Sequence, residues 1–265
     1  MRQISYAQAG SEALAEELRR DPKTLVLSTD AAPALVEEFG DQRIRATPIA
    51  EGAVTGMAIG AAGCGYRPIV NWRIVTFSFV AMDQIVNQAS KIHYMFGGQA
   101  KFPLVFRATV GGGGKLAAQH SQSPYSMFMN LAGLKIILPS TPYDMKGLMK
   151  SAIRDDNPVI SFESSRLMGF KGDVPEEEYT LPIGKADVKR EGSDITIVAI
   201  AWLVHEALAA AETLAKEGVS VEVVDPRSLF PLDAKTIRTS VRKTGRLLIA
   251  DEAGPTAGGN RRPGS

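Results

Sequence analysis

Two residues, a glutamate and a histidine, stand in contexts that could support proton transfer. Glu51 begins an apolar helical pattern directly after the segment 47–50. A carboxylate in the first turn of a helix is favoured by the helix dipole without any function. Alternatively, a desolvated carboxyl at this position would share its proton with a ligand nitrogen. His120 lies in a polar segment, where it would either donate a proton at neutral pH or remain a solvated side chain.

Two further segments could contact a ligand. Phe77 and Phe79 follow an expected strand, where aromatic side chains usually belong to the core, although one exposed ring could stack on a planar heterocycle. The glycine run 111–114 is followed by Lys115 and Leu116, so it lacks the Ser or Thr of a phosphate-binding P-loop. Glycine-rich loops outside that context commonly act as lids.

The end of a helix before Pro158 offers backbone oxygens. Residues 150–157 predict a helix C-terminus that turns before this proline. The last carbonyl groups of a helix lack intrahelical partners and are satisfied by caps, by water or by a cation.

Four glycines recur on one face of the helix that Glu51 begins. They are Gly52, Gly56, Gly60 and Gly63. Glycines at this spacing let another backbone approach closely, as at a tight helix–helix interface.

These segments require a scaffold in which short apolar strands alternate with longer helices. Such an alternation predicts a mostly parallel sheet with helices on both faces and with ligand sites at the carboxyl ends of the strands. An amphipathic surface helix is expected to end before Asp21 and Pro22. The further expected strands are 24–27, 68–71, 104–107, 135–138 and 159–162, and the expected helices are 53–64, 81–96 and 143–154.

A second, smaller α/β domain is expected after a linker. Residues 166–192 contain several glycines and prolines and the acidic run 176–178, which predicts a linker that crosses the surface. We expect the first domain to comprise residues 1–178, with this linker, and the second to comprise residues 179–265. The expected second-domain strands are 195–199, 219–224 and 246–250, and its helices are 203–216 and 234–243. The tail that follows predicts a truncated domain with an exposed sheet edge.

The composition excludes several classes of protein. The 265 residues carry a formal net charge of +1, so no strong field favours nucleic acid or an acidic membrane surface. One cysteine and three histidines are too few for a disulfide framework or a zinc cluster. The N-terminal segment lacks the apolar run of a signal peptide, and the stretch 52–65 is too short for a membrane span. Because Cys64 is expected to be a lone buried thiol, we predict a cytoplasmic location.

Five motifs occur along the chain in a fixed order. They are TPIAEG at 47–52, FSFVAMDQIVNQA at 77–89, AAQHSQS at 117–123, LPSTPYDMKGLMKSAIRDDNPVI at 138–160 and DPRSLFPLD at 225–233. Together they resemble the beta subunit of thiamine-diphosphate-dependent 2-oxoacid dehydrogenases, a branch of the transketolase-like family. The resemblance runs from the first helix to about Gly258, and relatives act on pyruvate, branched-chain 2-oxoacids or acetoin.

The resemblance implies a fold and a set of site residues. The fold is α/β, with a transketolase-type pyrimidine-binding domain and a truncated transketolase C-terminal domain. Glu51 matches the glutamate that bonds the aminopyrimidine nitrogen of thiamine diphosphate, and Phe77 matches the aromatic residue that stacks on that ring. His120 matches the loop histidine that protonates the lipoyl group during acyl transfer. The carbonyl groups that match a structural potassium site belong to Leu104, Ala152, Ile153, Asp155 and Asn157.

The resemblance also implies partners, because one family motif is missing. This family holds magnesium and the cofactor diphosphate with a Gly-Asp-Gly … Asn motif, whereas Gly172-Asp173 continues here to Val174. We therefore expect an alpha subunit that supplies the diphosphate and magnesium site, a heterotetramer, and a lipoyl-bearing dihydrolipoyl acyltransferase core. Two departures stand out: the acidic, glycine-rich loop after Leu27 is shortened, and Asn71-Trp72 replaces an acidic–aromatic pair.

The prediction is therefore the beta subunit of a 2-oxoacid dehydrogenase that acts on pyruvate. Acetoin and a branched-chain 2-oxoacid are alternative substrates for the same chemistry. A non-catalytic assembly subunit of the same fold is an alternative of a different class. A binding module for an unrelated small molecule has only the generic α/β architecture in its favour.

Overall fold

A computed structural model describes residues 1–254, and a seven-stranded sheet forms its centre. The strand order is β12-β6-β7-β5-β4-β2-β3, and every pair is parallel except β12 with β6. The strands are β2 (Thr24–Ser28), β3 (Ile44–Ala46), β4 (Arg67–Ile74), β5 (Val105–Val110), β6 (Lys135–Ile137), β7 (Val159–Ser164) and β12 (Ser228–Phe230). The sheet confirms the predicted α/β class, and β2, β4, β5, β6 and β7 overlap the expected strands, whereas β3 and β12 were not predicted.

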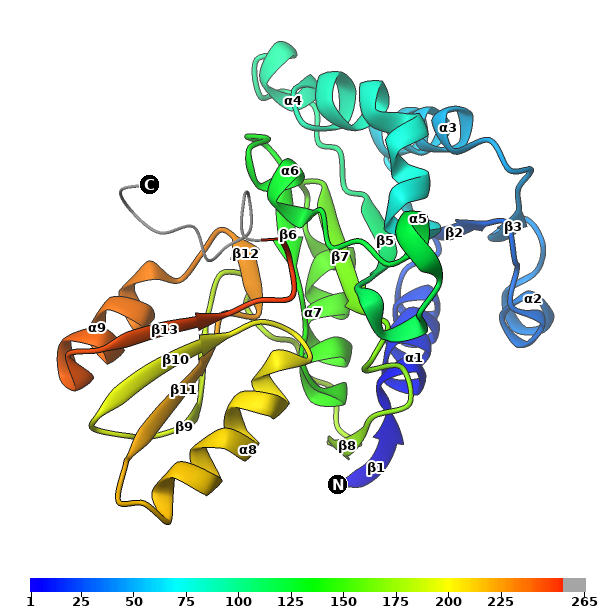
Figure 1. Cartoon of the computed structure of the whole chain (residues 1–265). Coiled ribbons are helices and arrows are strands. Elements are labelled where there is room, and N and C mark those ends of the chain that lie inside the picture. The colour runs from blue at the N-terminus through cyan, green and yellow to red at the C-terminus, as the bar shows by residue number, and fades with distance from the viewer. Residues whose placement is uncertain (255–265) are drawn as a thin grey trace.

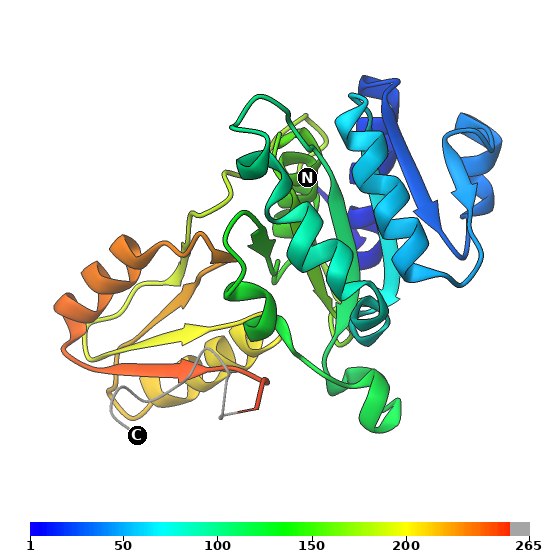
Figure 2. The same cartoon turned by 90° about the horizontal axis from the view of Figure 1, so that it is seen from above.

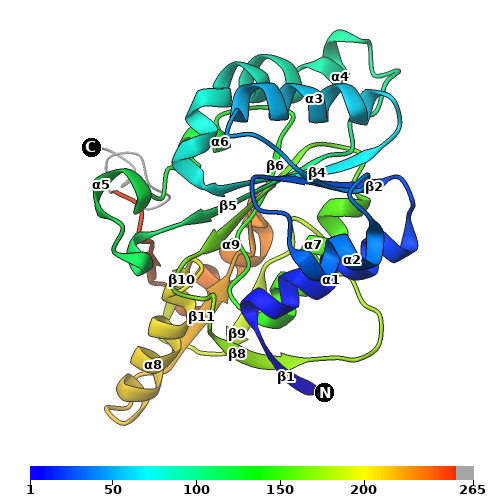
Figure 3. The same ribbon diagram turned by 90° about the vertical axis from the view of Figure 1, so that its right-hand side faces the viewer.

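Helices cover both faces of this sheet, as the sequence predicted (Figure 3). One face carries α1 (Tyr6–Arg20), α2 (Pro33–Phe39) and α7 (Pro142–Arg154). The other face carries α3 (Glu51–Gly63), the 3-10 helix η1 (Val75–Ala81), the π-helix η2 (Gln84–Ala89), α4 (Ile92–Met95) and α6 (Tyr125–Met129). Between β5 and α6 the chain forms a short 3-10 helix, η3 (Gly112–Gly114), and α5 (Ala117–His120).

A four-stranded sheet lies to one side of the large sheet (Figures 1 and 2). Its order is β13-β10-β11-β9, and β13 is an edge strand of the described sheet. Its elements are β9 (Asp187–Arg190), β10 (Ile195–Ala199), β11 (Val221–Asp225), β13 (Leu247–Ala250), α8 (Leu203–Ala215) and α9 (Ala234–Thr244). The expected tail 258–265 falls outside the described residues.

Three predictions about local structure were wrong. The single helix expected over 81–96 is divided into the end of η1, the π-helix η2 and α4, because the π-helix changes the hydrogen-bond period. The expected linker contains β8 (Lys171–Val174), which pairs antiparallel with β1 (Arg2–Ser5), and it also contains β9. Cys64 was expected to be buried, but it caps the end of α3 and is exposed.

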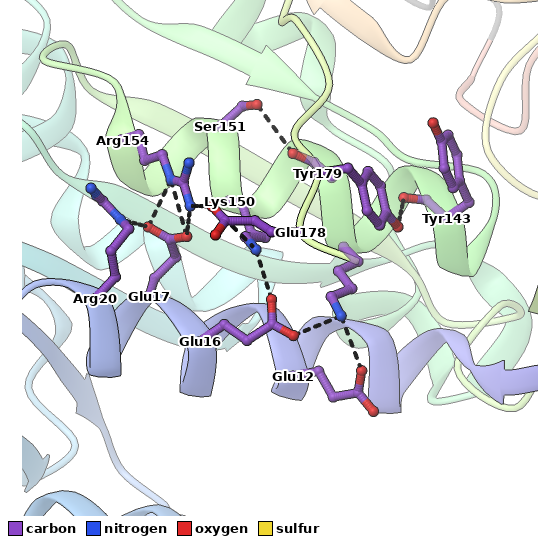
Figure 4. A network of polar contacts seen from close by, with 12 residues as sticks. Glu12, Glu16, Glu17, Arg20, Tyr143, Lys150, Ser151, Arg154, Glu178 and Tyr179 are labelled. Carbon is purple, nitrogen blue, oxygen red and sulfur yellow. Dashed lines mark hydrogen bonds and ion pairs between the residues drawn. The ribbon is translucent and has the colours of Figure 1, made fainter. Parts of the chain in front are cut away.

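Helices α1 and α7 are joined by paired charges, which Figure 4 shows. The Lys146 and Lys150 ammonium groups are almost fully buried, and each lies 2.7 Å from a carboxylate oxygen of Glu16. Burial alone would raise the pKa of Glu16, but the hydrogen bonds from the two lysines lower it below its usual value. Arg154 donates to both carboxylate oxygens of Glu17, the nearest contact being 2.6 Å. We call this set the α1–α7 seam.

The described part of the chain contains no helix that is both long enough and apolar enough to cross a membrane.

Candidate active site

A pocket of about 520 Å³ lies at the carboxyl ends of β2, β3 and β4. From β2 the chain passes to β3 on one side and then returns to β4 on the other side, so the strand order reverses at β2. Open parallel sheets bind ligands at such switch points, beyond the carboxyl ends of the strands. The lining residues are Thr29, Asp30, Thr47, Pro48, Ile49, Ala50, Glu51, Val54, Val70, Asn71, Trp72, Arg73 and Phe77.

Glu51 is the first residue of α3 and lines this pocket. The Ala50 carbonyl accepts the first helical hydrogen bond, from the Val54 N–H, which places the carboxylate at the positive end of the helix dipole. The Glu51 side chain is only half-buried, and Val54 and Val70 provide apolar walls beside it. The helix start thus presents the Glu51 carboxylate to a cavity, and the sharing of its proton with a ligand nitrogen stays a prediction.

Phe77 and His120 meet at the edge of the pocket. Phe77 lies in η1 and lines the cavity, and the ring centroids of Phe77 and His120 are 5.2 Å apart at an interplanar angle of 85°. Edge-to-face packing of this kind is a favourable aromatic geometry. The structure thus brings Glu51 and Phe77 into one cavity and places His120 next to them through the Phe77 ring.

Buried side chains that pack on one another form one wall of the pocket. The Trp72 indole N–H donates to Thr55 Oγ1 at 3.1 Å, and its ring stacks on Phe106 with centroids 4.6 Å apart. Trp72 and Phe106 are both buried in the core on the α3 face of the sheet. Because Trp72 also lines the pocket, this core fixes one wall of the cavity.

An ion pair between Arg73 and Asp30 stands at the pocket and was not predicted from the sequence. Arg73 has a φ of 65°, and its backbone N–H donates to the Asn71 side-chain oxygen at 2.9 Å. A non-glycine residue in this conformation costs roughly 1–3 kcal/mol and often marks a functional site. The available signal was positional, because Asp30 lies two residues after β2 and Arg73 lies near the end of β4, and the carboxyl ends of these two parallel strands meet at the same edge of the sheet.

The five carbonyl groups assigned to potassium lie at the opposite end of the sheet. Leu104 precedes β5, Ala152 and Ile153 lie in the last turn of α7, and Asp155 and Asn157 lie between α7 and β7. The Arg67 guanidinium donates from one nitrogen to the carbonyl oxygens of Ile153 and Asp155, at 3.1 and 3.0 Å. These two oxygens therefore converge on a cationic group that the chain itself provides. The Leu104 carbonyl accepts the Val159 N–H at 2.9 Å.

Two family models match the chain. The model described as the transketolase pyrimidine-binding domain matches residues 2–170, and the model described as the transketolase C-terminal domain matches residues 184–261. Among solved structures, a split-gene transketolase described as an inactive beta4 tetramer matches with a TM-score of 0.81 and 26% identity, covering 96% of this chain and 82% of that chain. The R525L mutant of Pichia stipitis transketolase matches with a TM-score of 0.66 at 17% identity, over 95% of this chain and 39% of that chain, which concerns the fold alone. The fold is therefore that of a two-domain, transketolase-type protein.

Three named proteins that are similar to this chain are beta subunits of oxidoreductases, which defines the family more closely than the fold does. The acetoin:2,6-dichlorophenolindophenol oxidoreductase beta subunit of Cupriavidus necator is 46% identical, with 96% of this chain and 80% of that protein aligned. The 2-oxoisovalerate dehydrogenase beta subunit of Bacillus subtilis is also 46% identical, over 94% of this chain and 79% of that protein. The pyruvate dehydrogenase E1 beta subunit of Bacillus subtilis is 41% identical, over 97% and 82%. The chain belongs to the family of beta subunits of thiamine-diphosphate-dependent 2-oxoacid dehydrogenases, which are oxidoreductases.

Proposed function

We propose that this chain, together with an alpha subunit, catalyses the oxidative decarboxylation of pyruvate and transfers the acyl group to lipoyl groups. The observation that carries the proposal is the shared pocket of Glu51 and Phe77 at the carboxyl ends of the strands. A carboxyl group and an aromatic ring on one cavity are the two contacts that an aminopyrimidine requires, one in the plane of the ring and one on its face.

The pocket fits this ring. Its volume of about 520 Å³ exceeds the needs of a single heterocycle, and Ile49, Val54 and Val70 supply apolar contacts. We propose that Glu51 holds a proton between its carboxylate oxygen and the pyrimidine nitrogen, while Phe77 packs on the ring face. Thiamine diphosphate, when bound, supplies the nucleophilic carbon and the ring that accepts the electrons left by decarboxylation.

His120 has a separate role in the proposal. Its imidazole would donate a proton to a lipoyl sulfur during acyl transfer, after the carbon dioxide has left. The support is its position beside Phe77, at the edge of the pocket and not within its lining. Glu51 would therefore contact the cofactor inside the pocket, and His120 would contact the lipoyl group at the edge of the pocket.

We propose that an alpha subunit completes the site and holds the diphosphate and its magnesium ion in a heterotetramer. Gly172 and Asp173 lie in β8, which pairs with β1, and this pair forms a separate two-stranded sheet. The α3 and α4 face carries exposed apolar side chains, including Tyr94 at 86% and Met95 at 70% exposure. Apolar surface of this kind commonly marks an interface.

We also propose a second protein partner, a bound potassium ion and a cellular location. A lipoyl-bearing dihydrolipoyl acyltransferase core would be the second partner. Potassium would share the Ile153 and Asp155 carbonyl oxygens with Arg67, since each oxygen has a second lone pair. The exposed free thiol of Cys64 favours a reducing compartment, and we infer a cytoplasmic location.

The preferred substrate is tested by comparing the activity of the enzyme on three compounds. The chain is 46% identical both to an acetoin enzyme subunit and to a 2-oxoisovalerate dehydrogenase subunit, so acetoin and a branched-chain 2-oxoacid are the alternative substrates. The co-expressed alpha and beta subunits should be assayed with thiamine diphosphate, magnesium and a reducible dye against pyruvate, acetoin and 3-methyl-2-oxobutanoate. The highest kcat/KM should belong to pyruvate, and a higher value for either other compound would reassign the substrate.

A Glu51→Gln variant tests the catalytic role. The amide cannot exchange a proton with the ring nitrogen, so the cofactor-dependent rate should fall about 100- to 10,000-fold. Glu37→Gln, an exposed change in α2, is the matched control and should retain full activity. An unchanged rate in Glu51→Gln would instead support a non-catalytic assembly subunit.

A further inference from the structure

The segment that follows β13 crosses from the small sheet to the loop that carries His120. The contacts of Glu252 with Gly111 and Ser123 place this segment against the ends of that loop. The Tyr125 hydroxyl, five residues after His120, donates a hydrogen bond to the Asp251 carboxylate. Ala253 is buried in the core of the large sheet, which anchors the crossing segment.

Glu252 contacts both ends of this loop, residues 111–124. At the first end, a Cβ added to Gly111 would lie 2.2 Å from Glu252 Oε1, so the carboxylate is packed directly on the glycine. At the other end, Ser123 Oγ donates to the same oxygen at 3.4 Å. The Gly111 N–H also donates to the Gln122 carbonyl at 3.0 Å. The two ends therefore meet at Glu252.

The loop needs such support because its backbone is strained. Lys115 and Ala117 have φ values of 50° and 61°, in the left-handed region that disfavours side chains. Conformations of this kind persist only where the surrounding structure holds them. Gly113 is held as well, since an added Cβ would lie 2.4 Å from the Arg166 side chain.

The surroundings of Glu252 favour its protonated form, because burial outweighs the nearby cation. Burial raises its pKa, the Arg166 guanidinium and the Ser123 hydroxyl lower it, and the neighbouring Asp251 raises it, with a net upward shift. A protonated Glu252 carboxyl would still be able to accept the Ser123 hydrogen bond.

We propose that Glu252, assisted by Asp251, is a positioning residue that closes the 111–124 loop and thereby sets the place of His120 beside Phe77. The C-terminal domain thus acts on acyl transfer without contacting the reacting atoms. This inference rests on the proposed role of His120 in acyl transfer, but the position of the loop can be measured without it.

The first test uses the beta chain with its alpha subunit and needs no substrate. Lys115 is an exposed trypsin site inside the loop. Glu252→Ala should increase the rate of cleavage after Lys115 by on the order of tenfold, because a partly buried hydrogen-bonded contact is lost. Glu252→Gln and Ser123→Ala are milder changes; the first should retain most of the protection and the second should lose part of it. Equal cleavage rates in wild type and Glu252→Ala would overturn the proposal.

The matched control is Glu191→Ala. Glu191 lies, like Glu252, in the C-terminal domain and pairs with Lys243 at 2.5 Å, but its side chain is 78% exposed. It should leave cleavage after Lys115 unchanged. Should Glu252→Ala fail to fold, the comparison of Ser123→Ala with the control decides the same question, and no increase in cleavage for Ser123→Ala would count against the proposal.

The second test separates two activities of the reconstituted enzyme. Reduction of an artificial dye reports decarboxylation alone, whereas acylation of a free lipoyl domain also requires His120. Glu252→Ala should lower the acylation rate about tenfold more than the dye rate, with Glu252→Gln restoring most of it. Equal losses in both assays would overturn the positioning role.

His120→Ala distinguishes this inference from the proposed function. If His120→Ala lowers both rates equally, the assignment of acyl transfer to His120 fails. If His120→Ala separates the two rates and Glu252→Ala does not, the function stands and the positioning role fails.

Discussion

The two faces of the large sheet are covered in different ways. On the face of α1 and α7, Lys146 and Lys150 are buried, yet both ammonium groups contact carboxylates within the chain. On the face of α3 and α4, a Cβ at Gly60 would meet nothing within 4 Å, and Tyr94 is largely exposed. The first face is completed by the chain itself, whereas the second presents the groups that the proposed alpha subunit would contact.

Removal of a carboxylate from the α1–α7 seam should have the largest effect on stability. In Glu16→Gln, Lys146 and Lys150 lose their nearest partner and keep only carboxylates at 3.4 and 3.9 Å. Leaving buried charges poorly compensated should reduce the free energy of unfolding by about 3 kcal/mol, measured by urea denaturation.

Glu38→Gln is the control for this prediction. Glu38 pairs with Arg19 at 2.5 Å, but both side chains are more than 40% exposed, so the loss of this pair should cost far less stability than Glu16→Gln. If the two variants lost equal stability, the distinction between a closed seam and an ordinary surface pair would be wrong.

The stability of the fold should also depend on pH through the buried carboxylate of Asp225. Burial and the neighbouring Asp144 raise the pKa of Asp225 to about 6, above the ordinary 3.8. The folded chain therefore holds this proton more tightly than the unfolded chain, and the stability contributed by Asp225 falls as the pH rises from about 4 to about 6.

Asp225→Asn should remove this dependence. The stability difference between wild type and Asp225→Asn, from urea denaturation, should become less favourable to wild type by about 2 kcal/mol between pH 4 and pH 7. A difference that stays constant across this range would contradict the raised pKa. Ser140, whose hydroxyl donates to Asp225 at 2.5 Å, must remain unchanged in this comparison.

The smallest expected change in stability comes from a substitution in α3, on the face of α3 and α4. Gly60 lies inside α3, where alanine is favoured over glycine, so Gly60→Ala should stabilise the isolated chain by about 0.5–1 kcal/mol. If a partner packs closely on this face, the same change should weaken its binding, as measured by titration calorimetry with the alpha subunit. Unchanged affinity would show that the glycine face lies outside the interface.

Local patterns were sufficient to predict most of the fold. The β-branched run of β10 and the capping pattern of α7, where Thr141 Oγ1 accepts the Asp144 N–H at 3.0 Å, define elements by themselves. The pairing of β8 with β1 was missed because it joins segments about 170 residues apart, which no local pattern reports. The π-helix η2 was missed because its sequence retains helical periodicity.

The candidate site was predicted in part. Glu51 and Phe77 came from motifs, and the structure places both on one pocket. Arg73 and Asp30 were missed because their pairing depends on a left-handed backbone at Arg73 and on the adjacency of two strand ends. The dependence of the 111–124 loop on Glu252 is likewise a long-range contact, between residues far apart in the sequence.

Strand β12 has a consequence for when the large sheet can be completed during synthesis of the chain. It comes from residues 228–230, beyond most of the small sheet, yet it pairs with β6 at the edge of the large sheet. A nascent chain emerging from the ribosome cannot finish its first sheet until this late segment has been synthesised. The edge of β6 consequently stays unpaired by β12 until residues 228–230 have been synthesised.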